Sequence, residues 1–149
     1  MKSLFHSSTL NEFVNRIEKL QPDSKAQWGK MRVEQMLAHC SIGLSVPLGE
    51  QQGTPGFVKG IFGRLIKPMV LGEKPFRKNS PTDPTFIVAD ERVFNKEKEE
   101  LIKRIKRFSQ AGESSFVGRV HPFFGKLTPR EWNILMAKHL DHHLQQFGA

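Results

Sequence analysis

The first predicted helix is marked by apolar residues that recur at helical spacing near the N-terminus. Five of them fall on one face of a helix: Leu10, Phe13, Val14, Ile17 and Leu20. Thr9 and Glu12 have the spacing of a capping box, which predicts the start of this helix. We expect it to end near Gln21 and Pro22.

Three more helices are predicted by the same kind of pattern. The second covers about residues 31–45 and turns Met36, Leu37, Cys40 and Leu44 inward. The third runs from about residue 90 or 95 to 108, ends before Gly112, and turns Leu101, Ile102, Ile105 and Phe108 inward. The last begins at a second capping box, Thr128 to Glu131, with Pro129 in the first helical position, and reaches about Phe147.

Residues 49–90 are punctuated by glycine and proline and predict a long crossover with one short helix around residues 58–67. A structureless loop of this length is unusual in a compact domain, so the segment either packs or forms a mobile lid. Packing is favoured, because five apolar side chains there need burial: Phe57, Ile61, Phe62, Leu65 and Ile66.

The four helices, without any longer alternating strand, predict an all-α fold. An antiparallel four-helix bundle is the natural packing, with the long crossover between its second and third helices. The 149 residues suit a single domain, residues 1–149.

The amino-acid composition excludes several classes of protein. Hydrophobic residues make up 38% and charged residues 26%, which excludes a fully disordered chain. A single cysteine, Cys40, excludes an internal disulfide framework and fits a reducing compartment. Neither a signal peptide nor a run of about 20 apolar residues is present, so we expect a cytoplasmic protein without membrane association.

Two histidines of the last predicted helix have the spacing of a metal-binding pair. His139 and His143 are four residues apart and project from the same helix face; His142 is an alternative partner for His139. Zinc-like ions need a third protein ligand, and His39 on the second helix is the best candidate. Three neutral imidazoles suit zinc or nickel rather than magnesium or calcium. The alternative is that these histidines are hydrogen-bonded core residues.

Other polar residues are candidates for supporting roles. His121, just before the last helix, either reaches the site as a fourth ligand or acid/base, or orders the turn that follows it. Gln35 and Gln146 are candidates for orienting ligands or substrate. Glu34 lies about 140° around the helix from His39, so we do not expect it to be a base. Cys40 is interpreted as a small core residue, and Asp141 as pointing to solvent.

Five sequence blocks together resemble the DinB-like (YfiT-like) superfamily, in particular a bacterial branch of unknown function. They are WGKM at residues 28–31, MLAH at 36–39, HPFFG at 121–125, LTP at 127–129 and HLDHHLQQF at 139–147. The resemblance implies a four-helix bundle that holds a divalent metal through His39, His139 and His143. It also implies a metal-dependent thiol S-transferase, with a low-molecular-weight thiol as co-substrate, or a hydrolase.

The net charge of +8 raises the question of a polyanionic partner. A cationic run at residues 103–107 follows three glutamates, and the pairs Glu99–Lys103 and Glu100–Arg104 favour a solvated helix face. Nucleic acid is therefore not the expected partner; the basic crossover favours a small anionic substrate, and a homodimer stays open. Three functions remain: a metal-dependent enzyme, a non-catalytic metal- or ligand-binding module, and a basic interaction protein with structural histidines.

Overall fold

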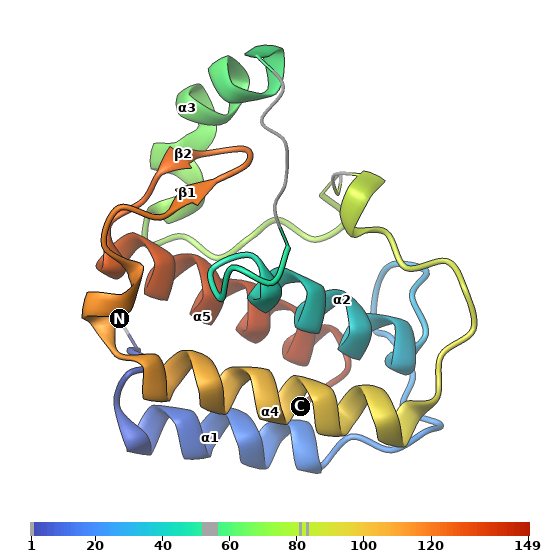
Figure 1. The fold of residues 1–149 in the computed structure, drawn as a ribbon. Coiled ribbons are helices and arrows are strands. Elements are labelled where there is room, and N and C mark those ends of the chain that lie inside the picture. The colour runs from blue at the N-terminus through green and yellow to red at the C-terminus, as the bar shows by residue number, and fades with distance from the viewer. Residues whose placement is uncertain (1, 52–56, 81, 83) are drawn as a thin grey trace.

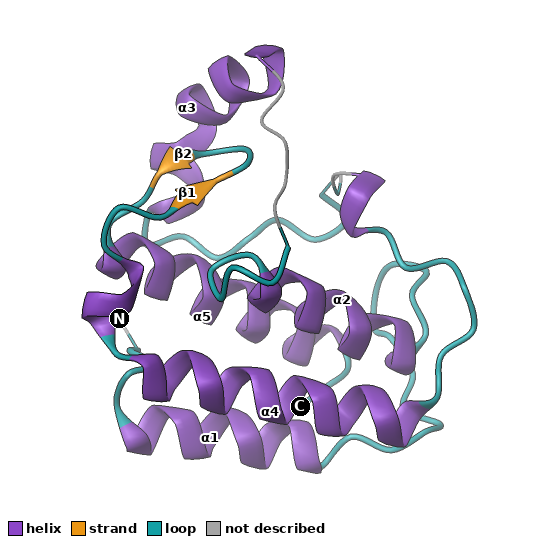
Figure 2. Cartoon of the chain, in the orientation of Figure 1, coloured by secondary structure: helices purple, strands orange, loops and turns teal. Residues whose placement is uncertain are grey.

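The fold is all-α, as predicted, in the computed structural model, which describes residues 2–51, 57–80, 82 and 84–149 (Figure 1). The α-helices in this part of the chain are α1 (Ser7–Glu18), α2 (Val33–Ser45), α3 (Phe57–Leu71), α4 (Phe94–Ala111) and α5 (Pro129–Gln146). Two short 3₁₀ helices, η1 (Pro84–Phe86) and η2 (Glu113–Phe116), lie in the connections. The strand content is one small antiparallel ladder, β1 (Val120–His121) with β2 (Gly125–Lys126) (Figure 2).

Four of the helices enclose the core. α2 packs against α4 and α5, and α1 packs against the same two helices, so that the four form a closed ring. α2 is buried on nearly all sides, which explains why its sequence is apolar around most of its circumference. The inward residues predicted for α2 are all buried: Met36, Leu37, Cys40 and Leu44. No helix in the described part of the chain combines the length and apolar character needed to cross a bilayer.

The predicted start of the last helix is confirmed and that of the first is wrong. Thr128 caps α5: its side chain accepts a hydrogen bond from the Glu131 amide, and the Glu131 carboxylate accepts one from the Thr128 amide. α1 begins at Ser7 instead, so Thr9 lies inside the helix. The tertiary structure fixes this earlier start, because Leu4 is completely buried and its amide donates to Asn133 Oδ1 at 2.8 Å.

The remaining boundaries lie close to expectation. α1 ends at Glu18, three to four residues earlier than predicted, and α2 begins at Val33 rather than residue 31. α4 continues past residue 108 to Ala111 and ends at Gly112, whose φ of 71° suits a glycine. Differences of this size are normal at helix ends, which fray and are set by local capping.

The crossover contains a longer helix than predicted, and its packing was predicted incorrectly. α3 stands beside the β1–β2 ladder and outside the four-helix ring, where it contacts α5 and β2 (Figure 1). Phe62 is 57% exposed and Leu65 is 75% exposed, whereas Ile66 is half-buried. The side chains of Phe57 and Ile61, and residues 52–56, 81 and 83 of the crossover, lie outside the described residues.

Gly63 explains which side of α3 faces the molecule. A Cβ atom at this position would lie 1.8 Å from the Phe123 carbonyl oxygen, so only glycine allows this approach to the turn between β1 and β2. Leu65, about 160° around the helix from Gly63, consequently faces outward. Phe62 is also largely exposed, although its ring packs edge-on against Phe123, with the ring centroids 6.2 Å apart. The expectation of burial was therefore wrong for these two residues.

The cationic run on α4 is neutralised differently from the prediction. Arg104 and Arg107 both pair with Glu50, which follows α2, and Arg104 also donates to Ser41. Lys103 pairs with Glu100 at 4.0 Å, three residues away. The predicted i, i+4 pairing of Arg104 is thus replaced by a contact that ties α4 to the start of the crossover.

Thr128→Ala should destabilise the protein by about 1 kcal/mol, because it removes the acceptor that caps α5. Thr9→Ala is the matched control and should change stability by less than about 0.5 kcal/mol, since Thr9 is not at a helix start. Urea unfolding of both variants measures the difference. Equal losses would contradict the assignment of the α1 start.

Candidate metal centre

Three histidines from two helices converge in the interior. His39 comes from α2, and His139 and His143 come from adjacent turns of α5, which packs against α2. One ring nitrogen from each of the three lies within 4.8 Å of the others. We call this set the three-histidine cluster. His142, the alternative partner in the sequence, turns instead toward Trp28 and Phe76, with ring centroids 5.6 and 5.9 Å away.

The cluster is mostly buried, and one of its three residues is less buried than the other two. His39 is 5% exposed and His143 is 8% exposed, whereas His139 is of intermediate exposure. Gly43, one turn after His39, makes room for the His139 ring: a Cβ there would lie 3.1 Å from His139 Cε1. α2 therefore supplies both a histidine and the space for the opposing one.

The protonation of the His39 ring is fixed by its backbone partner. His39 Nδ1 lies 2.8 Å from the carbonyl oxygen of Phe86 in η1. A carbonyl only accepts hydrogen bonds, so Nδ1 carries the proton and donates. In the neutral ring the Nε2 lone pair then faces the cluster.

The ring of His143 is fixed by a relay of two hydrogen bonds through Gln146. Gln146 Nε2 donates to the Trp28 carbonyl oxygen at 2.7 Å, which assigns the orientation of the amide group. Gln146 Oε1 therefore faces His143 Nδ1 at 2.8 Å and accepts a hydrogen bond from its N–H group. The Nε2 lone pair of His143 is left unused by this relay.

The separations suit a shared ion. His39 Nε2 and His139 Nε2 are 2.9 Å apart. Three nitrogens at about 2.0–2.1 Å from a tetrahedral zinc lie about 3.3–3.4 Å from one another, so binding requires adjustments of a few tenths of an ångström between these two rings. Buried imidazoles whose second nitrogen is held by a carbonyl or amide are the usual environment of histidine ligands.

Burial keeps the cluster neutral at physiological pH. It lowers the pKa of His39, and it lowers the pKa of His143 to about 3. The pKa of His139 is held well below 6.5 by burial and by the charge that neighbouring imidazoles would carry. Since a metal binds the neutral ring, binding at pH 7 requires no net loss of protons from the three rings; in the metal-bound form His139 would carry its proton on Nδ1 rather than between its Nε2 and that of His39.

His121 lies outside the three-histidine cluster. Its Nδ1 accepts hydrogen bonds from the amides of Phe123 and Phe124 at 3.0 and 3.2 Å. The ring is buried against Phe124 and Trp132, with centroids 4.7 and 5.4 Å away. These contacts match the structural alternative, in which His121 orders the turn that follows it.

The other sequence candidates also have structural partners. Gln35 accepts from the Arg32 amide and donates to the Asp90 carbonyl, so it holds the start of α2 and not the cluster. Cys40 is buried beside Met36, and burial raises the pKa of its thiol, which suits a core residue. Asp141 points away from the cluster to the surface, as expected: its side chain is 40% exposed, and it pairs there with Arg16 at 2.7 Å.

Three contributors to the site were not predicted from the sequence. Two are the backbone carbonyls of Trp28 and Phe86; every residue has a carbonyl group, so residue types do not predict this role. The third is Gly43, four residues after His39, and this spacing could have been recognised as a gap facing the other helix.

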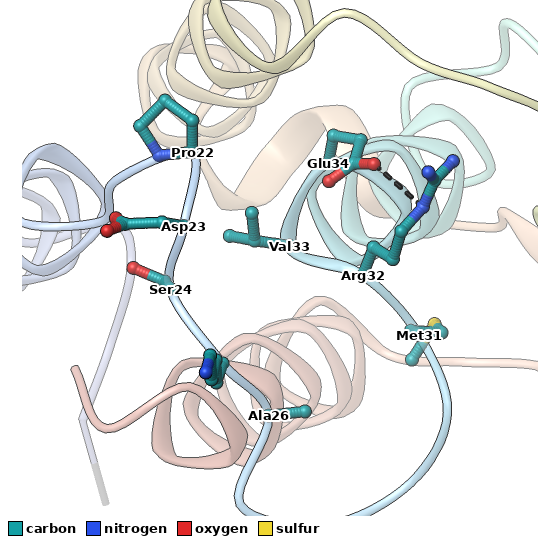
Figure 3. Close-up of a pocket in the computed structure, with 9 residues that line it drawn as sticks. Pro22, Asp23, Ser24, Ala26, Met31, Arg32, Val33 and Glu34 are labelled. Carbon is teal, nitrogen blue, oxygen red and sulfur yellow. Dashed lines mark ion pairs between the residues drawn. The ribbon is translucent and has the colours of Figure 1, made fainter.

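A larger hollow lies away from the histidines. It has a volume of about 430 Å³ and lies between the segment after α1 and the start of α2 (Figure 3). Its lining includes Asp23, Lys25, and the ion pair of Arg32 with Glu34 at 2.9 Å. Glu34 thus faces this hollow, in agreement with the expectation that it is not a base for the cluster.

One protein family matches almost the entire sequence. Its description is "Protein of unknown function (DUF1569)", and the match covers residues 2–149. No curated protein and no solved structure shows significant similarity to the chain.

Acidification should destabilise the metal-free protein, and His121 accounts for part of the loss. Burial lowers its pKa to about 4, whereas an unfolded histidine titrates near 6.5. Between these values the unfolded chain binds the proton and the folded chain does not, so stability present above pH 6.5 is lost as pH falls. The His121 contribution to this loss between pH 7 and pH 5 is about 2 kcal/mol.

Urea unfolding of the wild type and His121→Gln at pH 7 and pH 5 measures this contribution of His121 to stability. The pH-dependent loss should be smaller by about 2 kcal/mol in the variant. His6→Gln, at an exposed position, is the control and should retain the wild-type dependence. An unchanged dependence in His121→Gln would show that His121 is not kept neutral by the fold.

Proposed function

Because the chain belongs to the family described as "Protein of unknown function (DUF1569)", membership assigns no activity, and we propose one from the site: a divalent-metal-dependent enzyme. Its metal ligands are His39, His139 and His143. The reaction is a transfer to a small thiol or a hydrolysis. This proposal rests on one observation, the three ring nitrogens within 4.8 Å of one another.

The donor set favours a particular kind of ion. Three neutral imidazoles without a carboxylate suit zinc or nickel, and three protein ligands leave a position for substrate. Bound there, such an ion would act as a Lewis acid that lowers the pKa of a coordinated water or thiol. A small molecule would approach the ion from the side of His139, the least buried of the three residues.

The chain's own residues hold and orient this site. The Phe86 carbonyl fixes the proton of His39, and Gln146 fixes that of His143. Gln146 is therefore a positioning residue in this proposal. His121 is engaged in its own turn and keeps the adjoining loop in place.

The resemblance to the DinB-like superfamily agrees with this function. That superfamily has a four-helix bundle with histidines on its second and last helices. In the present chain, α1, α2, α4 and α5 form a closed ring, and the three histidines lie on α2 and α5. The arrangement supports assigning the fold as a four-helix bundle of this type, with α3 as an addition in the crossover.

Purified protein should bind about one equivalent of Zn²⁺ or Ni²⁺, and His139→Ala or His143→Ala should weaken binding by more than about 100-fold. The loss of a ligand exceeds the 10- to 100-fold effect usual for a ligand's hydrogen-bond partner. His142→Ala is the matched control, because its ring faces Trp28 and Phe76, and it should keep the metal. Elemental analysis and metal titration measure both, with circular dichroism to verify folding.

The outcomes separate the three functions considered. Metal that is absent, or unchanged in folded His139→Ala, would refute the site and leave a basic protein with structural histidines. Stoichiometric metal without turnover, in a screen of thiols with electrophiles and of ester and amide substrates, would indicate a binding module. Turnover that requires the metal and is lost in His139→Ala would establish the enzyme.

Gln146→Met should weaken metal binding by about 10- to 100-fold, since it removes the acceptor that orients His143. Gln145→Met is the matched control: Gln145 contacts Asp141 on the outside of α5, and its substitution should leave the affinity unchanged. Gln146→Glu retains an acceptor and should bind the metal more tightly than Gln146→Met. Equal affinity in the two Gln146 variants would show that Gln146 only fills space.

A further inference from the structure

A small cleft lies on the flank of α5 beside the three-histidine cluster. Its volume is about 130 Å³, and its walls include Trp28, Phe76, Lys78, Lys138 and His142. The walls come from three parts of the chain: the segment before α2, the segment after α3, and α5 itself. The combination of aromatic rings with ammonium groups in its walls makes it suited to a ligand with an apolar body and a negative end.

The two lysines are fixed against aromatic rings. Lys138 donates to the carbonyls of Val70 and Gly72 and lies 4.8 Å from the centre of the Phe76 ring. Lys78 lies 4.3 Å from the centre of the Trp28 ring. In the part of the chain that the structure describes, no carboxylate forms an ion pair with Lys78, so its charge is available to a ligand.

The acidic residue of the cleft does not cancel this positive charge. Asp141 pairs with Arg16 at 2.7 Å and accepts a hydrogen bond from Gln145, also at 2.7 Å. Its charge is therefore compensated from the α1 side. The cleft retains a net positive character from Lys78 and Lys138.

Trp28 takes part in the cleft through its ring and not through its polar atom. Its indole Nε1 is buried and has no hydrogen-bond partner among the described residues. A buried donor without an acceptor costs about 1–3 kcal/mol. Because this atom is closed off from the surface, the cost belongs to the fold and is not relieved by a ligand in the cleft.

The cleft and the cluster share neighbouring residues, although none of the three cluster histidines lines the cleft. His142 forms part of its wall, and the His142 ring centroid is 5.1 Å from that of His143. Trp28 contributes its ring to the cleft and its carbonyl to Gln146, which in turn orients His143. A molecule in the cleft therefore contacts the same residues that support the ligands.

We propose that this cleft binds the carboxylate end of the substrate, a small organic acid whose reactive end extends toward the three-histidine cluster. The proposal rests on the function proposed above and adds the substrate class. Lys78 is the specificity-determining residue, since its ammonium group would pair with the carboxylate. Lys138 shapes the wall and adds to the positive charge.

Benzoate is the probe for anion binding, and benzamide is its neutral counterpart. Calorimetry on the metal-free protein should show benzoate binding at least about tenfold more tightly than benzamide, a factor that corresponds to about 1.4 kcal/mol. Lys78→Gln should remove this preference, and Lys78→Arg should retain it. Lys74→Gln, an exposed lysine of the same segment outside the cleft, should leave it unchanged. Equal binding of the two probes, or equal effects at positions 74 and 78, would overturn the proposal.

The proximity of bound benzoate to the three-histidine cluster is tested with Co²⁺ as a paramagnetic probe in the wild-type protein. Co²⁺ should increase the nuclear relaxation rates of bound benzoate, and this increase should disappear in Lys78→Gln that still binds Co²⁺. Benzoate bound without enhanced relaxation would overturn the link to the cluster. Failure of Co²⁺ to bind would count against the metal site itself, while the calorimetry would still decide whether the cleft selects anions.

Discussion

The convergence of three neutral imidazoles at one buried point is the constraint on which the site depends. A protonated ring there would be separated from water and would face two other rings that could also become positive, so burial favours the neutral form. Neutral rings have lone pairs, and lone pairs directed at a common point need either a proton between them or a cation. The pair of Nε2 atoms at 2.9 Å shows how close this contact is in His39 and His139.

The connections between helices decide where these lone pairs point. The helices bring the rings together, but a carbonyl in η1 and a carbonyl before α2 determine which nitrogen of His39 and His143 carries the proton. Phe86 lies at the end of the crossover, and Trp28 lies in the α1–α2 connection. The crossover is therefore part of the site and not only a link between α2 and α4. Any ligand that orders the cluster would also stabilise these connections, because binding to the folded state alone shifts the folding equilibrium.

The sequence was most informative where periodicity and local capping act together. The α5 start at Thr128 and Pro129 was predicted because a capping box is a local interaction. The same pattern at Thr9 was misleading, since the buried Leu4 fixes an earlier helix start through contacts with α5. The orientation of α3 depends on Gly63 meeting a carbonyl 60 residues later, and such a contact leaves no periodic signal. For the histidines, spacing predicted a shared face on α5, whereas the choice of His143 over His142 required the position of Trp28.

The backbone carbonyl and the ring of Trp28 link the three-histidine cluster to the neighbouring cleft. Its carbonyl is held in place by Gln146, and its ring contacts the Lys78 ammonium group and, at a tilted angle, the His142 ring. Gly29 permits this geometry: its φ is +80°, and a Cβ there would lie 2.7 Å from Gln146 Nε2. A larger residue at position 29 would displace either Gln146 or the turn that carries Trp28. The turn at residues 28–29 thus couples the orientation of the His143 ring to the wall of the cationic cleft. In the proposed site, this one short segment would contribute both to recognising a charged substrate and to orienting a metal-binding histidine.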